Sequence, residues 1–142
     1  NELYMNRPDE AYLTHARRIT DSIVALQHNG QTGEKADWNG GYYTPPRSTP
    51  TATRSEGLGA AYFIFTRAGD ETYTATAQDV MEKGLEFQLR TQFSGRQLAK
   101  LSGDTKATGG FHESLDEYTI RIDYVQHNIS ALLAFDRIEN AE

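Results

Sequence analysis

Near the end of the chain, an aspartate and a histidine stand one helical turn apart, at Asp123 and His127. On a helix this spacing puts both side chains on one face, so the carboxylate can orient the imidazole and hold its tautomer. An imidazole held in this way serves as a general base, and Glu56 supplies a further carboxylate. We therefore name Asp123, His127 and Glu56 as candidate catalytic residues. The alternative is a buried histidine that the aspartate merely satisfies.

Two arginines precede these carboxylates by two positions, in Arg54-Ser55-Glu56 and Arg121-Ile122-Asp123. We place all four charged residues in the first turns of two predicted helices, where they would meet at one rim. Guanidinium groups beside the free N–H groups of helix N-termini favour an anionic ligand such as a uronate or a phosphate. In the competing interpretation each arginine pairs with its neighbouring acid and orders the loop. The sequence leaves both interpretations open.

Several large aromatic residues fall in segments that are rich in glycine, proline and polar residues: Trp38, Tyr42, Tyr43 and Phe111. Flat rings in a cleft stack on sugars or isoprenoid chains, and packing of the loop against the helices is the alternative. With Arg54, Arg121 and His112, these residues form the predicted ligand-binding set. A metal site combining His112, Glu113, Asp123 and His127 is conceivable, but no spacing requires it, so we predict no metal and no cofactor.

Hydrophobic periodicity predicts an all-α fold whose four main helices position these residues. The helices span about 8–27, 53–68, 71–92 and 120–138, and long loops cover 30–50 and 93–118. The second helix is apolar on nearly every face and should be buried all round. Its Gly57 and Gly59 lower helix propensity, so we expect them to permit a close backbone approach.

The two halves of the chain resemble each other in the order of their features. Gly40-Gly41-Tyr42 matches Gly109-Gly110-Phe111 at a shift of 69 residues, and Arg54-Ser55-Glu56 matches Arg121-Ile122-Asp123 at a shift of 67. The agreement of helix, loop, Gly-Gly-aromatic and Arg-x-acid indicates an internal repeat. We therefore predict one domain or fragment, residues 1–142, with repeats at about 8–69 and 70–139.

This pattern resembles the α/α-toroid proteins, in which helical hairpins surround a barrel axis. Its markers are a helix that ends near Gln27 or Gln92 and a following Gly-Gly-Tyr or Gly-Gly-Phe loop. They are similar to the repeats of terpenoid cyclases, protein prenyltransferases and several polysaccharide-processing families. The resemblance implies two hairpins of an incomplete toroid, because such barrels use five to seven. The chain lacks the cyclase Asp-x-Asp-Asp motif and has no cysteine for the prenyltransferase zinc site.

Composition narrows the partners and the compartment. The net charge of -6 argues against nucleic acid, and no apolar run reaches the ~20 residues that span a bilayer, so we expect a soluble protein without a membrane partner. The absence of cysteine fits the cytoplasm and the periplasm equally well. The chain begins with Asn and not Met, so a processed product or a piece of a longer protein is expected as readily as a complete one.

The leading functional prediction is a toroid-type protein that binds, and in one version processes, an acidic carbohydrate or other anionic ligand at the rim where the inner helices begin. As an enzyme it would be a carbohydrate-active lyase or hydrolase. One alternative is a non-catalytic helical repeat module that associates with itself, as a homo-oligomer, with another protein or with the remainder of a longer chain. A second is a terpenoid-type hydrophobic pocket, against which the two arginines argue.

Overall fold

The computed structural model describes residues 2–31, 34–101 and 104–140 and confirms the all-α prediction. Four long helices dominate: α2 (Glu10–Leu26), α3 (Ser48–Ala68), α4 (Glu71–Arg90) and α6 (Ile122–Glu139). Shorter helices are α1 (Glu2–Asn6), α5 (Gly95–Lys100) and the 3-10 turns η1 (Ala36–Trp38) and η2 (Thr105–Ala107). Within the described residues, β pairing is limited to isolated bridges in the loops. None of the described helices combines the length and apolar character needed to cross a membrane.

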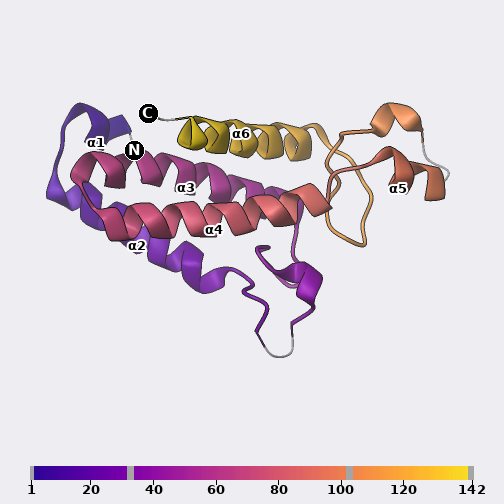
Figure 1. Ribbon diagram of the computed structural model, residues 1–142, viewed down its shortest axis with the longest axis horizontal. Helices are drawn as coiled ribbons and strands as arrows, with labels where there is room; N and C mark the ends of the chain where they lie inside the picture. The colour runs from indigo at the N-terminus through magenta and orange to yellow at the C-terminus, as the bar shows by residue number, and fades with distance from the viewer. Residues whose placement is uncertain (1, 32–33, 102–103, 141–142) are drawn as a thin grey trace.

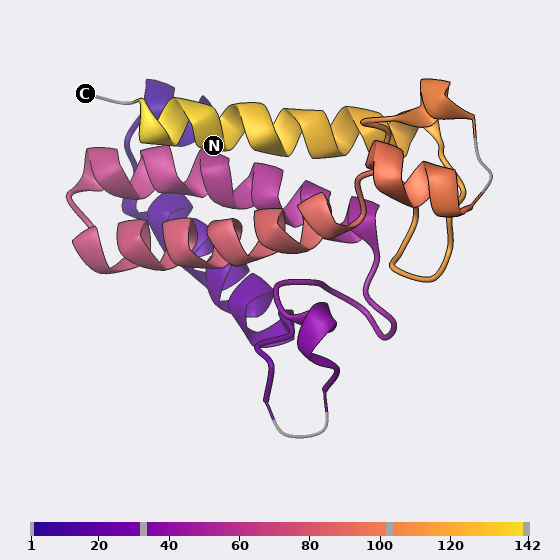
Figure 2. The same cartoon turned by 45° about the vertical axis from the view of Figure 1, so that its right-hand side comes forward.

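The long helices alternate in direction along the chain (Figure 1). Helices α3, α4 and α6 lie side by side, and α2 crosses beneath them at an angle, as both views show (Figures 1 and 2). Because α3 and α6 run opposite to α2 and α4, the first turns of α3 and α6 lie at one end of the bundle. Both long loops connect at that end, at the right of Figure 1.

Helix α3 is the centre of the core, because it packs against α2, α4 and α6. Its side chains Leu58, Ile64 and Phe65 are almost fully buried. The expected close approach at Gly59 is confirmed, since a Cβ there would lie 3.1 Å from Ala134 Cβ. The same expectation is wrong for Gly57, where a Cβ would meet nothing within 4 Å. Gly57 therefore lies on the open side of the helix.

The start of α3 differs most from the sequence prediction. The helix begins at Ser48, with Arg47 as its N-cap, and not near residue 53. Pro50 lies in the first turn, where a missing N–H leaves no helical hydrogen bond unmade, so it does not exclude a helix there. Arg54 and Glu56 therefore lie beyond the first turn, which corrects their predicted position. Arg121 and Asp123 do lie at the start of α6, as its N-cap and in its first turn.

The structure adds a short helix in the stretch that we expected to be a loop. Helix α5 begins with a capping box, in which the Ser94 side chain accepts from the Gln97 backbone and the Gln97 side chain accepts from the Ser94 backbone. This Ser-x-x-Gln pattern is a known start signal for a helix and was legible in the sequence. We expected a loop here because the segment is rich in glycine and polar residues.

Candidate functional site

Two glutamines at the ends of α2 and α4 fasten the two long loops in the same way. Gln27 Nε2 donates to the carbonyl of Gly40, and Gln92 Nε2 donates to the carbonyl of Gly109, each at 3.1 Å. Both glycines have φ of 86°, which favours glycine strongly. These shared bonds support the proposed repeat and give the glutamine and glycine markers a physical role. Gln27 also donates to the carbonyl of Val80 on α4, at 2.9 Å.

The aromatic residue after each Gly-Gly pair anchors its loop in the interior. Tyr42 and Phe111 are each 1% exposed. Neither ring is available to a ligand through an open face, so the packing alternative holds for both. Trp38 is half-buried. Its ring and the His28 ring form a T-shaped contact with 5.3 Å between their centroids. Lys35 Nζ lies 5.3 Å from the centroid of the Trp38 ring.

Tyr43 is the exception among these aromatics, because 57% of its surface is exposed. Its φ of 75° is rare for a residue with a side chain, so the backbone here is held in a strained form. His28 holds it from one side, with Nε2 2.5 Å from the Tyr43 carbonyl and Nδ1 2.7 Å from Glu34. The hydrogen bond from His28 lowers the pKa of the Glu34 carboxyl. Tyr43 is thus an exposed ring on a fixed backbone.

Arg54 reaches from α3 to these tyrosines. Its guanidinium carbon lies 4.8 Å from the ring centroid of Tyr42 and 5.3 Å from that of Tyr43. Its Nη1 donates to the carbonyl of Pro50 at 2.8 Å. No carboxylate pairs with it within the described parts of the chain. The structure therefore holds a cation in place by aromatic and carbonyl contacts and leaves its charge uncompensated.

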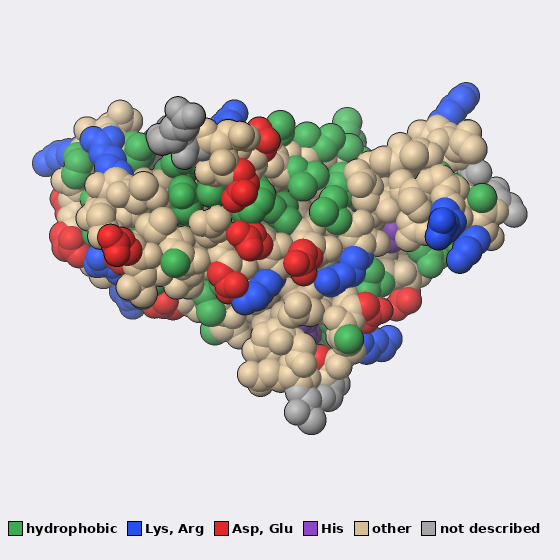
Figure 3. Space-filling model, in the orientation of Figure 1, with side chains coloured by type: hydrophobic (Ala, Val, Ile, Leu, Met, Phe, Trp, Pro, Cys, Tyr) green, Lys and Arg blue, Asp and Glu red, His purple; other side chains and the backbone are tan. Residues whose placement is uncertain are grey.

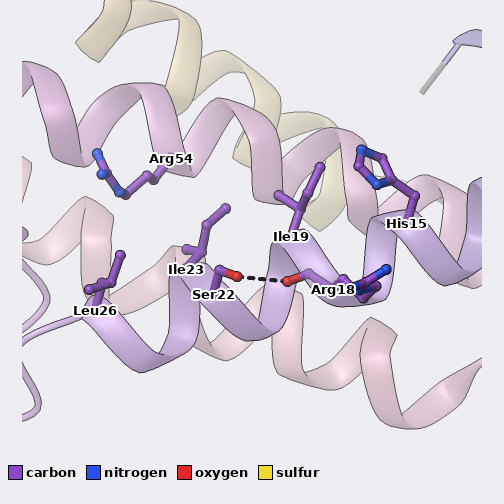
Figure 4. Close-up of a pocket in the computed structure, with 7 residues that line it drawn as sticks. All are labelled: His15, Arg18, Ile19, Ser22, Ile23, Leu26 and Arg54. Carbon is purple, nitrogen blue, oxygen red and sulfur yellow. Dashed lines mark hydrogen bonds between the residues drawn. The ribbon is translucent and has the colours of Figure 1, made fainter.

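Arg54 also lines an open groove between α2 and α3 (Figure 4). The groove has a volume of about 530 Å³, and its lining residues are His15, Arg18, Ile19, Ser22, Ile23, Leu26 and Arg54. Figure 4 shows Arg54 at the Leu26 end of the groove and His15 with Arg18 at the other. Every charged or titratable residue in this lining is basic, although the chain as a whole carries a net charge of -6.

The candidate catalytic residues form different pairs from the one we predicted. His127 Nδ1 lies 3.0 Å from Glu56 Oε2, which joins α6 to α3. Asp123 instead accepts from Arg121 Nε at 3.0 Å. The predicted pairing of Asp123 with His127 is therefore wrong, because the arginine at the N-cap takes the aspartate and the neighbouring helix offers the histidine a carboxylate. Both residues of the Glu56–His127 pair keep over a quarter of their side-chain surface exposed.

Arg121 belongs to a neutralised surface network and not to a free cationic site. Besides its pair with Asp123, its guanidinium carbon lies 5.2 Å from the Tyr124 ring centroid. The Tyr124 hydroxyl donates to Glu113 at 3.2 Å, and Arg47 pairs with the same carboxylate at 3.4 Å. For Arg121, the interpretation in which each arginine pairs with its neighbouring acid is the one seen in the structure.

His112 is buried in the second loop, with 1% of its surface exposed. Its ring packs against Phe93 and Tyr118, and its Nδ1 donates to the Ser114 carbonyl at 2.7 Å. Burial lowers the pKa of His112, and its Nε2 has no hydrogen-bond partner among the residues that the structure describes. Across the described ranges, no three histidine or acidic side chains gather where they could hold a metal ion. His112 therefore has a packing role in this structure.

Arg54 and Glu56 face different sides of α3. Side chains two positions apart in a helix point about 200° apart around its axis. Arg54 therefore points to the α2/α3 groove, while Glu56 meets α6. The predicted convergence of four charges at one rim is not seen: Arg54 stands alone with its tyrosines, and Arg121 pairs with Asp123. Sequence reasoning did not single out Arg18 and His15, because their contribution depends on the angle at which α2 crosses α3.

Comparison of the chain with protein-family models, with curated proteins and with solved structures found no match. Its function therefore has to be argued from the residues and their geometry.

Proposed function

We propose that the chain binds an acidic carbohydrate or a closely related anionic ligand at Arg54. The observation that carries the proposal is a guanidinium group held over two tyrosine rings without a carboxylate partner in the described residues. An arginine that is not neutralised within its own chain is free to form charge-assisted hydrogen bonds with a carboxylate or phosphate. The exposed Tyr43 ring beside it offers a flat surface for a sugar.

The α2/α3 groove extends this site for a ligand with more than one charge. Arg18 and His15 lie at its far end, and Ile19, Ile23 and Leu26 line it between the two basic ends. An acidic oligosaccharide has repeated carboxylates and apolar sugar faces, which correspond to this alternation of charge and apolar surface. A neutral sugar would lose the charged contacts, so we expect the site to discriminate by charge.

The same geometry favours binding over catalysis at this site. The acid–base pair that the structure offers, Glu56 with His127, lies on the opposite side of α3 from Arg54. A ligand held by Arg54 is therefore not presented to that pair. The toroid architecture stays a proposal, supported by the matching bonds of Gln27 and Gln92.

Titration with a uronate oligomer, and with an uncharged oligomer of the same length, tests this proposal by calorimetry at two salt concentrations. We expect binding of the uronate only, weaker at high salt, because the contacts are ionic. Arg54→Ala should weaken it at least ~10-fold, which corresponds to the 1.5–3 kcal/mol of a typical charged hydrogen bond. Equal affinity for both oligomers, or an unchanged affinity in Arg54→Ala with intact helicity, would contradict the proposal.

A second candidate function, association with other helical units, is favoured by exposed apolar residues on the long helices. On α6, Ile129 and Leu133 are 46% and 55% exposed, and on α2 Leu26 is 63% exposed. Helical hairpin units usually bury such faces against neighbours. The proposed homo-oligomer belongs to this second candidate.

A further inference from the structure

Helix α2 carries a straight stripe of exposed apolar residues along one flank, where Ile19 and Leu26 also border the α2/α3 groove. Tyr12, Ile19 and Leu26 are seven residues apart and are 39%, 48% and 63% exposed. A seven-residue spacing keeps side chains along one line of a helix, as in the seam of a coiled coil. His15 and Arg18 flank this stripe. We call these five residues the basic ridge.

On a different face, α4 and α6 form a groove with the opposite charge. Leu85, Leu89, Leu132 and Phe135 supply its apolar surface, and every charged residue in its lining is acidic: Glu82, Glu86 and Glu139. Figure 3 shows apolar side chains between α6 and α4 with carboxylates beside them. Leu89 at the edge is 50% exposed. We call these seven residues the acidic groove.

The charges of both surfaces are largely uncompensated within the described chain. Arg18 takes part in no ion pair there, and neither do Glu82 and Glu139. The Glu82 and Glu139 carboxylates accept only from the neutral amide of Gln78. Glu86 has a distant partner in Arg90, at 3.6 Å. Each surface thus offers charge of one sign beside an apolar strip.

We propose that the basic ridge of one molecule docks into the acidic groove of a second copy of the same chain. An amphipathic helix that lays its apolar face in a groove between other helices is a recurring mode of recognition. The three apolar residues of the ridge, one every seven positions along α2, would bury their side chains against Leu85, Leu89 and Phe135. Arg18 and His15 would face Glu82, Glu86 and Glu139, which gives both attraction and register.

The charge pattern also decides the symmetry of the contact. Two basic ridges repel each other, and so do two acidic grooves, so a two-fold interface through like surfaces is disfavoured. Because the ridge and the groove lie on different faces, one contact uses the ridge of one molecule and the groove of the other, so it is heterologous, head to tail, and leaves a free ridge at one end and a free groove at the other. Molecules therefore add in series, and assembly rises with concentration. This inference rests on the second candidate function. Because His15, Arg18, Ile19 and Leu26 also line the α2/α3 groove, a docked copy and a ligand that extends along that groove would compete for the same surface.

A charge-reversal mixing experiment tests the inference by analytical ultracentrifugation. We expect the wild-type chain to grow beyond a monomer as concentration rises. Arg18→Glu damages the ridge, and the double variant Glu82→Arg with Glu86→Arg damages the groove. Each alone should lower the self-association constant at least ~10-fold. Mixed one to one, they should associate again, to a dimer or beyond, because each variant retains the surface that the other has lost and the two reversed surfaces again carry opposite charges.

Surface charge reversals elsewhere provide matched controls: Lys100→Glu and Asp116→Arg lie on exposed residues outside both surfaces and should assemble as the wild type does. Ile19→Ser supplies a second ridge variant without a charge change, and circular dichroism checks its helicity. A wild-type chain that stays monomeric at all concentrations would overturn the proposal. So would assembly that survives both reversals, or a mixture that stays monomeric. Arg54→Ala lies outside the ridge and the acidic groove, so it should weaken uronate binding and leave self-association unchanged. The two proposals can therefore fail separately.

Discussion

The first and second long loops share a frame but differ in what they expose. In both, a glutamine at the end of a helix binds the carbonyl of a left-handed glycine, and a buried aromatic follows. The first loop then leaves Tyr43 in solvent beside the Arg54 guanidinium, which has no acidic partner among the described residues. In the second, His112 at the equivalent position is buried, and Arg121 at the following helix is neutralised by Asp123. One frame thus supports an open cationic site and a closed, packed loop.

The largest expected difference between the loops concerns their left-handed glycines. A Cβ at Gly40 would lie 1.8 Å from the Lys83 carbonyl oxygen, whereas one at Gly109 would meet nothing within 4 Å. Gly40→Ala should therefore lower the free energy of unfolding by at least about 3 kcal/mol, because strain and backbone overlap add. Gly109→Ala should cost only about 1 kcal/mol, from its φ alone. Urea denaturation measures both, and equal losses would break the comparison.

The helix boundaries show which parts of the fold could be predicted from the sequence and which could not. The pattern of polar and apolar faces is local, so all four long helices were predictable from sequence; on α2, Leu13, Ala16 and Thr20 form the buried face. The start of α3 was misplaced because Pro50 and its polar neighbours resemble a loop, although a first turn accepts proline. As a result, Arg54 and Arg121 do not occupy equivalent positions in their helices. In α3 and α6 the buried positions coincide at a shift of 73 residues, as with Ser55 and Asn128, and not at 67.

The site was predictable in its residue types but not in its partners. The first loop folds back onto α3 and brings Tyr42 and Tyr43 to Arg54. This contact cannot be predicted from the spacing of the residues in the sequence. His127 meets Glu56 for the same reason, because the packing of α6 against α3 brings together two residues that are 71 positions apart in the chain. Local spacing favoured Asp123 instead, since only neighbours along one helix are visible in a sequence. Pairings between helices depend on how the helices pack.

A second difference between the loops should appear on acidification. Burial lowers the pKa of His112, so the folded chain binds its proton less readily than the unfolded chain does. Its contribution to stability is complete above the ordinary pKa of about 6.5 and is lost as pH falls below that value. His112→Asn should flatten the dependence of unfolding free energy on pH between 7 and 5. An identical slope in the variant and the wild type would show that His112 is not the titrating group.

The smallest expected effect concerns the two buried aromatic anchors, Tyr42 and Phe111. The Tyr42 hydroxyl is buried and has no hydrogen-bond partner within the described part of the chain, and burial raises its pKa. Tyr42→Phe gives the first loop the anchor of the second and should leave the stability unchanged or raise it by about 1 kcal/mol or less. Thermal unfolding monitored by circular dichroism measures the change. A loss above about 1 kcal/mol would mean that the hydroxyl is bonded in solution.

The most direct test of the difference between the two loops compares Arg54→Gln with Arg121→Gln in one uronate-binding assay. Both changes remove one positive charge, from the open first loop in Arg54→Gln and from the ion pair with Asp123 in Arg121→Gln. We expect Arg54→Gln to weaken binding at least ~10-fold and Arg121→Gln to change it by less than about twofold. Equal losses in both variants, or a larger loss in Arg121→Gln, would contradict the account.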